Sequence, residues 1–147
     1  MSSEETIETH SETETIVAAQ NFAKTLSGGE VICLYGTLGM GKSVFARSII
    51  RTLSGDSDLD VPSPTFTLVQ IYDEQNAPAP IWHFDLYRLE DTEEIYETGW
   101  EDALGEAILI IEWPERLGSL KPSHSIDVHI TANGKTAQRT IQIKRPA

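Results

Sequence analysis

The sequence predicts a mixed α/β fold, with one sheet that is parallel at its centre and antiparallel towards its edges. Residues 31–35 and 107–111 are apolar runs without polar alternation, which is typical of parallel strands covered on both faces. Residues 126–130 and 141–143 instead alternate between apolar and polar side chains, and Asn133-Gly134 lies between these two segments. That pattern predicts a hairpin with one solvated face, and therefore an antiparallel edge.

Helices are expected before and after the first strand. Ser11 and Glu14 match a capping box at a helix start. Apolar side chains then recur at helical spacing until Gly28-Gly29 supplies the stop. A second helix is expected from Gly41 to about Leu53, with one apolar stripe that packs against the sheet.

The middle of the chain combines a hairpin with short helical segments. Residues 66–72 and 81–85 are predicted to be paired strands, joined by a turn rich in Asn, Ala and Pro. Asp91 and Glu94 indicate a capped helix that ends before Gly99. Residues 100–104 are expected to add a further helical piece.

The length and composition predict one domain in a reducing compartment. The chain has 147 residues, and we expect a single domain over residues 11–147, preceded by an acidic, disordered tail at 1–10. The one cysteine, Cys33, lies in the first apolar run and is expected to pack in the core. No apolar run approaches the roughly 18 residues that a membrane span needs, so we expect a cytoplasmic protein.

The charge of the chain bears on its partners. The formal net charge is -12, which argues against a broad surface for nucleic-acid backbones, because such surfaces use clustered Lys and Arg. If RNA is involved, we expect another protein to hold it.

A glycine-rich loop with the spacing of a phosphate-binding P-loop follows the first strand. Its residues are Gly36, Thr37, Leu38, Gly39, Met40, Gly41, Lys42 and Ser43. The glycines permit backbone conformations in which N–H groups point at phosphate oxygens, and the next helix adds its positive end. Lys42 would reach the β- and γ-phosphates, while Ser43 would offer its hydroxyl to Mg²⁺. The loop therefore predicts a nucleotide site in a three-layer fold like that of P-loop NTPases.

Two carboxylates at strand ends are candidates for the acid that a P-loop needs near its metal ion. Glu112 follows the second apolar run, at the sheet edge where such folds bind ligands, and Asp85 ends the strand 81–85. Each also fits a solvated acid at a strand end. Thr65 is the kind of hydroxyl that senses a γ-phosphate in a switch loop, although a capped turn explains it equally well. His83 shares a strand face with Asp85, and interior packing is its preferred interpretation.

Other side chains have weaker claims on the site. Trp113 is adjacent to Glu112, so its fluorescence could report on the site. Four arginines are candidate charge stabilisers, although the sequence places none of them over a phosphate: Arg47, Arg51, Arg88 and Arg116.

Four ordered motifs together resemble the TsaE family, small bacterial ATPases required for tRNA threonylcarbamoyladenosine biosynthesis. The motifs are the P-loop, residues 63–69, residues 83–89, and Glu112-Trp113-Pro114. The resemblance spans about residues 11–130 and implies ATP and Mg²⁺ as cofactors. It also implies partners of the TsaB and TsaD types, which transfer a threonylcarbamoyl group to the adenosine beside the tRNA anticodon. ATP binding and hydrolysis by this chain would reset that assembly, and the chain would meet tRNA only indirectly.

The resemblance also implies roles for individual residues. Lys42 binds phosphate, Ser43 and Glu112 hold Mg²⁺, Asp85 and Thr65 lie in the hydrolytic site, and the stretch from Glu12 to Thr15 approaches the base. The sequence departs from the family pattern in its loop: Thr37 replaces the usual acid, Met40 the usual alanine, and Ser43 the more frequent threonine. Serine keeps the hydroxyl that a magnesium ligand needs.

Two other functions use the same loop. A small-molecule P-loop kinase would need a lid with several arginines, whereas the six arginines here are scattered along the chain. A nucleotide-gated binding module would bind nucleotide without significant turnover.

Overall fold

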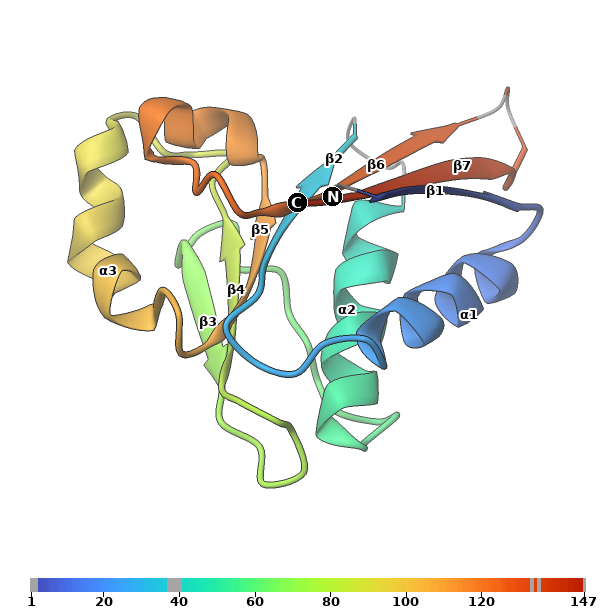
Figure 1. Ribbon diagram of the computed structural model, residues 1–147, viewed down its shortest axis with the longest axis horizontal. Coiled ribbons are helices and arrows are strands. Elements are labelled where there is room, and N and C mark those ends of the chain that lie inside the picture. The colour runs from blue at the N-terminus through green and yellow to red at the C-terminus, as the bar shows by residue number, and fades with distance from the viewer. Residues whose placement is uncertain (1–2, 37–40, 133, 135, 147) are drawn as a thin grey trace.

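The computed structural model describes residues 3–36, 41–132, 134 and 136–146, and these residues form one seven-stranded sheet with flanking helices (Figure 1). In sheet order the strands are β1 (Ser3–Thr9), β7 (Arg139–Arg145), β6 (Ile126–Ala132), β2 (Val31–Tyr35), β5 (Ile108–Glu112), β4 (Ile81–Asp85) and β3 (Val69–Tyr72). The strands β6, β2, β5 and β4 are parallel to one another, while β1, β7 and β3 pair antiparallel to their neighbours. The predicted mixed sheet, parallel at its centre and antiparallel at its edges, is confirmed.

Helices cover both faces of this sheet. The helical elements are α1 (Glu12–Ala23), α2 (Lys42–Ser54), the 3₁₀ helix η1 (Thr92–Thr98), α3 (Trp100–Ala103) and the 3₁₀ helix η2 (Pro114–Leu120). Side chains of α1 and α2 share a buried cluster with Ile32 and Leu34 of β2, whereas η1, α3 and η2 share one with Val31 and Cys33. Figure 1 accordingly shows α1 and α2 on one side of the sheet and α3 on the other. This double covering explains why β2 has no polar alternation.

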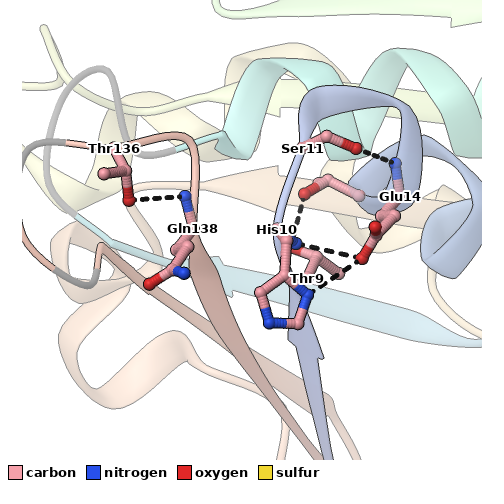
Figure 2. Close-up of polar contacts among 7 residues, drawn as sticks. Thr9, His10, Ser11, Glu14, Thr136 and Gln138 are labelled. Carbon is pink, nitrogen blue, oxygen red and sulfur yellow. Dashed lines mark hydrogen bonds and ion pairs between the residues drawn. The ribbon is translucent and has the colours of Figure 1, made fainter.

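The first helix begins as the sequence predicts but ends earlier. Ser11 is the N-cap of α1, and its hydroxyl accepts a hydrogen bond from the Glu14 N–H at 3.1 Å (Figure 2). The Glu14 carboxylate accepts from the His10 N–H at 3.0 Å, so it reaches one residue beyond the N-cap. The helix ends at Ala23, and Leu26 lies in the following turn, although it still packs in the core.

The prediction of a disordered tail was wrong for residues 3–9. These residues form β1, which pairs antiparallel with β7 over its whole length and places Ile7 opposite Ile141. The glutamates of β1 remain exposed, while Ile7 packs against the core and Thr9 is buried. The strand is held mainly by backbone pairing with a segment at the far end of the chain, which local composition cannot reveal.

Two further elements differ from the predictions. The strand β3 begins at Val69 instead of residue 66, because Leu68 adopts a left-handed φ of 68° that ends the preceding turn. The segment after Asp91 is a 3₁₀ helix instead of an α-helix. Its N-cap is the predicted Asp91, and it stops before Gly99 as expected.

Cys33 lies in the core, as predicted. Its side chain is fully buried in β2, and this burial raises the pKa of the thiol to about 12. The thiol is therefore unreactive at neutral pH. None of the described helices combines the length and the apolar character that crossing a bilayer requires.

Candidate functional site

One pocket of about 290 Å³ brings together most of the predicted site residues. Its walls are formed by Glu12, Thr15, Gly41, Lys42, Ser43, Val44, Ser63, Thr65, Asp85, Glu112, Trp113, Ala137 and Arg139. Gly36, the first residue of the loop, directly follows β2. The predicted site residues Thr37, Leu38, Gly39 and Met40 lie outside the described residues.

The two described glycines of the loop have structural reasons to be glycine. A Cβ atom at Gly36 would lie 2.8 Å from the carbonyl oxygen of Ile130, which is too close for any side chain. Gly41 is the N-cap of α2 and has a left-handed φ of 97°, which side-chain-bearing residues rarely adopt. Gly41 has no side chain with which to cap the helix, so the first turn of α2 presents its N–H groups and the positive end of its dipole at the pocket wall.

Lys42 is the only described lysine in the pocket wall, and it has an unusual environment. The residue is 4% exposed, and its ammonium is buried with no hydrogen-bond partner among the described residues. Its Nζ lies 3.8 Å from the ring centroid of Trp113. Burial lowers the pKa of Lys42, while the charges of Glu112, Glu115 and Asp85 act in the opposite direction. A buried cation without a hydrogen-bond acceptor is suited to receive an anion.

Asp85 is hydrogen-bonded to Thr65, the residue whose hydroxyl is a candidate sensor of a γ-phosphate. The Thr65 hydroxyl donates to Asp85 Oδ2 at 2.9 Å, and the Tyr87 N–H donates to Oδ1 at 3.0 Å. The Ser63 hydroxyl lies 2.7 Å from the Thr65 hydroxyl and extends this chain. The loop from 63 to 65 is therefore tied to the end of β4 by the side chain of Asp85.

Glu112 lies beside Asp85 because β4 and β5 are parallel and in register, so that each acid ends its own strand. Glu112 is 4% exposed, and its Oε2 lies 2.7 Å from Nε2 of His83. His83 is buried, which agrees with the prediction that it packs in the interior. It also contacts the carboxylate of Glu112. The sequence placed His83 on the Asp85 face, and only the register between the strands shows that Glu112 shares that face.

Sequence reasoning missed several residues of the pocket wall. Arg139 is the first residue of β7, and Ala137 lies just before that strand. Both come close to α1 because Arg139 pairs with Thr9, three residues before α1 begins. The Thr9 and Thr15 hydroxyls lie 2.8 Å apart and join β1 to α1 at this point. Figure 2 shows the segment from Thr136 to Gln138 beside that from Thr9 to Glu14.

Arg139 lies in the pocket wall, although it was not among the arginines proposed from the sequence as charge stabilisers. Its Nη1 donates to the carbonyl oxygens of Thr136 and Gln138. Among the described residues it is the one arginine in the pocket wall, whereas the four candidates from the sequence lie elsewhere. No pattern in the sequence around residue 139 points to this placement.

The donor set of the pocket fits Mg²⁺ bound together with phosphate. Asp85 and Glu112 supply carboxylate oxygens, and Ser43 and Thr65 supply hydroxyl oxygens. In the part of the chain that the structure describes, no three His, Cys, Asp or Glu side chains form a ready-made metal cluster. Magnesium commonly binds one or two carboxylates and completes its shell with waters and substrate phosphates, so these residues suit it.

Trp113 should report nucleotide binding by a change in fluorescence. Its ring lies under the Lys42 ammonium and 5.0 Å from the Tyr87 ring, and its backbone has a left-handed φ of 60°. A phosphate that attracts Lys42 would remove the cation from the indole, so we expect the emission to change with saturation. The measurement is a titration with ATP and Mg²⁺. Trp113→Phe, which leaves Trp82 and Trp100 as emitters, should abolish the change, and a persisting change would locate the signal elsewhere.

Comparisons with known proteins agree on one family. The family model described as "Threonylcarbamoyl adenosine biosynthesis protein TsaE" matches residues 9–141. A tRNA threonylcarbamoyladenosine biosynthesis protein TsaE from Rickettsia bellii is 42% identical over 121 residues, which are 82% of this chain and 82% of the relative. The protein of the same name from Aquifex aeolicus is 41% identical over 106 residues, which are 72% of this chain and 74% of the relative.

A solved structure shows the same fold. "Crystal structure of Bacillus subtilus YdiB" superposes with a TM-score of 0.77 at 23% identity, and the match covers 100% of this chain and 88% of that one.

Proposed function

Because the chain belongs to the TsaE family of tRNA threonylcarbamoyladenosine biosynthesis proteins, we propose that it is the ATP-binding and ATP-hydrolysing subunit of that process. The observation that carries this proposal is the Lys42 ammonium, which is buried without a described hydrogen-bond partner at the start of α2. It lines the same pocket as the carboxylates of Asp85 and Glu112. A cation and a helix N-terminus for phosphate, next to acids for a metal ion, are the parts that a P-loop ATPase uses.

The residues of the pocket divide among three tasks in this proposal. The loop from Gly36 to Ser43, with Lys42, binds the phosphates in a three-layer fold of the P-loop NTPase type. Ser43 and Glu112 hold Mg²⁺, which would neutralise charge on the phosphates. Asp85 and Thr65 act at the γ-phosphate, where their hydrogen bond supports the role by coupling the 63–65 loop to β4. The wall formed by Glu12 and Thr15 receives the base.

The subunit would act on a complex of the TsaB and TsaD types in the cytoplasm. That complex would transfer the threonylcarbamoyl group to the adenosine next to the tRNA anticodon, and this chain would bind ATP and reset the complex between turnovers. The net charge of -12 supports contact with a basic protein surface over direct contact with tRNA.

Steady-state phosphate release tests the proposal. We expect the isolated protein to hydrolyse ATP slowly, on the order of one turnover per minute or less, as P-loop enzymes do before a partner completes their site. Adding TsaB- and TsaD-type proteins should raise this rate, and the increase should weaken as salt screens the acidic surface.

Three outcomes separate the proposed function from its alternatives. A fast rate from the protein alone that partners do not change would contradict a partner-dependent ATPase. Phosphate transfer to a small acceptor would favour a kinase. ATP binding without phosphate release, with or without partners, would favour a nucleotide-gated binding module.

A further inference from the structure

A buried histidine on β4 contacts a site carboxylate from outside the pocket. The side chains of His83 and Glu112 are 3% and 5% exposed, with Nε2 and Oε2 at 2.7 Å. The other ring nitrogen, Nδ1, is buried, and none of the described residues hydrogen-bonds to it. Packing alone does not account for this residue, because an apolar side chain would fill the position without leaving a buried polar atom unpaired.

The sheet register sets how His83 approaches Glu112. In the parallel pair of β4 and β5, His83 lies opposite Ile110 and Asp85 lies opposite Glu112. His83 therefore lies on the same sheet face as Glu112, two residues further from the strand ends. Its neighbours on that face, Ile81 and Ile110, belong to the buried core. The imidazole thus reaches the carboxylate from the core side, while Glu112 also lines the pocket.

We propose that His83 is a positioning residue that holds the Glu112 carboxylate for magnesium, and this inference rests on the proposed function. A hydrogen bond from Nε2–H to Oε2 fixes the rotation of the carboxylate and directs its other oxygen to the pocket. One N–H donor occupies one carboxylate oxygen and leaves the other for a cation. Removing a hydrogen-bond partner of a metal ligand typically lowers metal affinity by about 10- to 100-fold.

The test compares two substitutions of His83. His83→Phe keeps a planar ring without a donor, and His83→Gln places an amide N–H near the position of Nε2. His83→Phe should raise the Mg²⁺ concentration for half-maximal ATP hydrolysis by about 10- to 100-fold. ATP affinity measured by calorimetry in EDTA should remain that of the parent protein. His83→Gln should restore most of the magnesium affinity.

Two further variants separate positioning from general damage. His129→Phe is the matched control, since it makes the same replacement at a strand histidine that stacks on Tyr35, and it should leave the magnesium requirement unchanged. In a Glu112→Gln background, His83→Phe should add no further loss. Independent, additive losses would show that His83 does not act through Glu112.

The outcomes distinguish this inference from the proposed function. A parent protein whose ATP binding and hydrolysis ignore Mg²⁺ would overturn both. A magnesium-dependent parent with an unchanged His83→Phe variant, or equal losses in His83→Phe and His83→Gln, would overturn the positioning role alone. If His83→Phe does not fold, the long-range ¹⁵N–¹H spectrum of the parent decides: a proton on Nε2 supports the role, and a bare Nε2 overturns it.

Discussion

Replacing Lys42 with methionine should lower ATP affinity by about 10- to 100-fold, because a hydrogen bond to a charged group contributes about 1.5–3 kcal/mol and 1.4 kcal/mol is tenfold. Methionine keeps most of the apolar stem of the lysine, so the substitution removes mainly the charged group that lies over Trp113. The remaining affinity would come from backbone N–H groups and the N-terminus of α2.

The same substitution should leave the fold as stable as the parent or make it more stable. Burial lowers the pKa of Lys42 from its usual 10.5, against the opposing charges of Glu112, Glu115 and Asp85. A lysine with a lower pKa in the folded state disfavours folding below that pKa. The cost disappears as the pH rises from the folded-state pKa to 10.5. Removing the charge therefore removes this cost at pH 7.

Calorimetry with ATP and urea denaturation at pH 7 measure the two effects on the same sample. Lys42→Arg is the matched control that keeps a positive charge, and it should retain more affinity than Lys42→Met. Unchanged ATP affinity in Lys42→Met would refute the assignment of the loop. A clear loss of stability would show that the buried ammonium supports the free protein instead of awaiting a phosphate.

Glu112→Gln should raise the Mg²⁺ concentration for half-maximal ATP hydrolysis by about 100-fold or more. Removing a hydrogen-bond partner of a metal ligand lowers metal affinity by up to about 100-fold, and a change to the ligand itself should cost at least as much. The amide keeps the shape of the side chain but loses the charge that attracts a hard cation. His83 adds to this effect, because its N–H would select the amide oxygen and turn the NH₂ group towards the pocket. ATP binding in EDTA should persist.

Asp85→Asn provides the comparison on the neighbouring strand. The asparagine can keep the Tyr87 N–H only by turning its NH₂ group towards Thr65, whose hydroxyl must then accept instead of donate. We therefore expect slower hydrolysis at saturating Mg²⁺, with a smaller change in the magnesium requirement than in Glu112→Gln.

Indistinguishable magnesium titrations for Glu112→Gln and the parent would assign Glu112 a purely structural role.

The sheet centre and edges differ in how far they can be predicted from the sequence. Burial on both faces leaves β2 and β5 as continuous apolar runs, and such a pattern is local. Ile7 is the one apolar side chain of β1, and the backbone of the strand pairs with β7 at the opposite end of the chain. Nothing within residues 3–9 encodes that partner.

The site shows the same division between local and long-range information. Lys42, Ser43 and the two strand-end acids could be predicted, because the loop spacing and the ends of apolar strands are features of short segments. Arg139 could not, since it reaches the pocket through the pairing of β1 with β7. The contact between His83 and Glu112 depends on the register of two parallel strands, which a sequence pattern specifies only weakly.

The strand β1 also determines what the sheet presents to other proteins. It covers the edge of β7, which carries the apolar side chains of Ile141 and Ile143, and it replaces that edge by one bearing exposed Glu4, Glu5 and Glu8. Rows of like charge on an outer strand oppose the addition of a further strand from another molecule. The strand β1 thus opposes edge-to-edge aggregation of the sheet. A shortened protein that began at α1 would leave the backbone N–H and C=O groups of β7 open to pairing with a strand of another molecule.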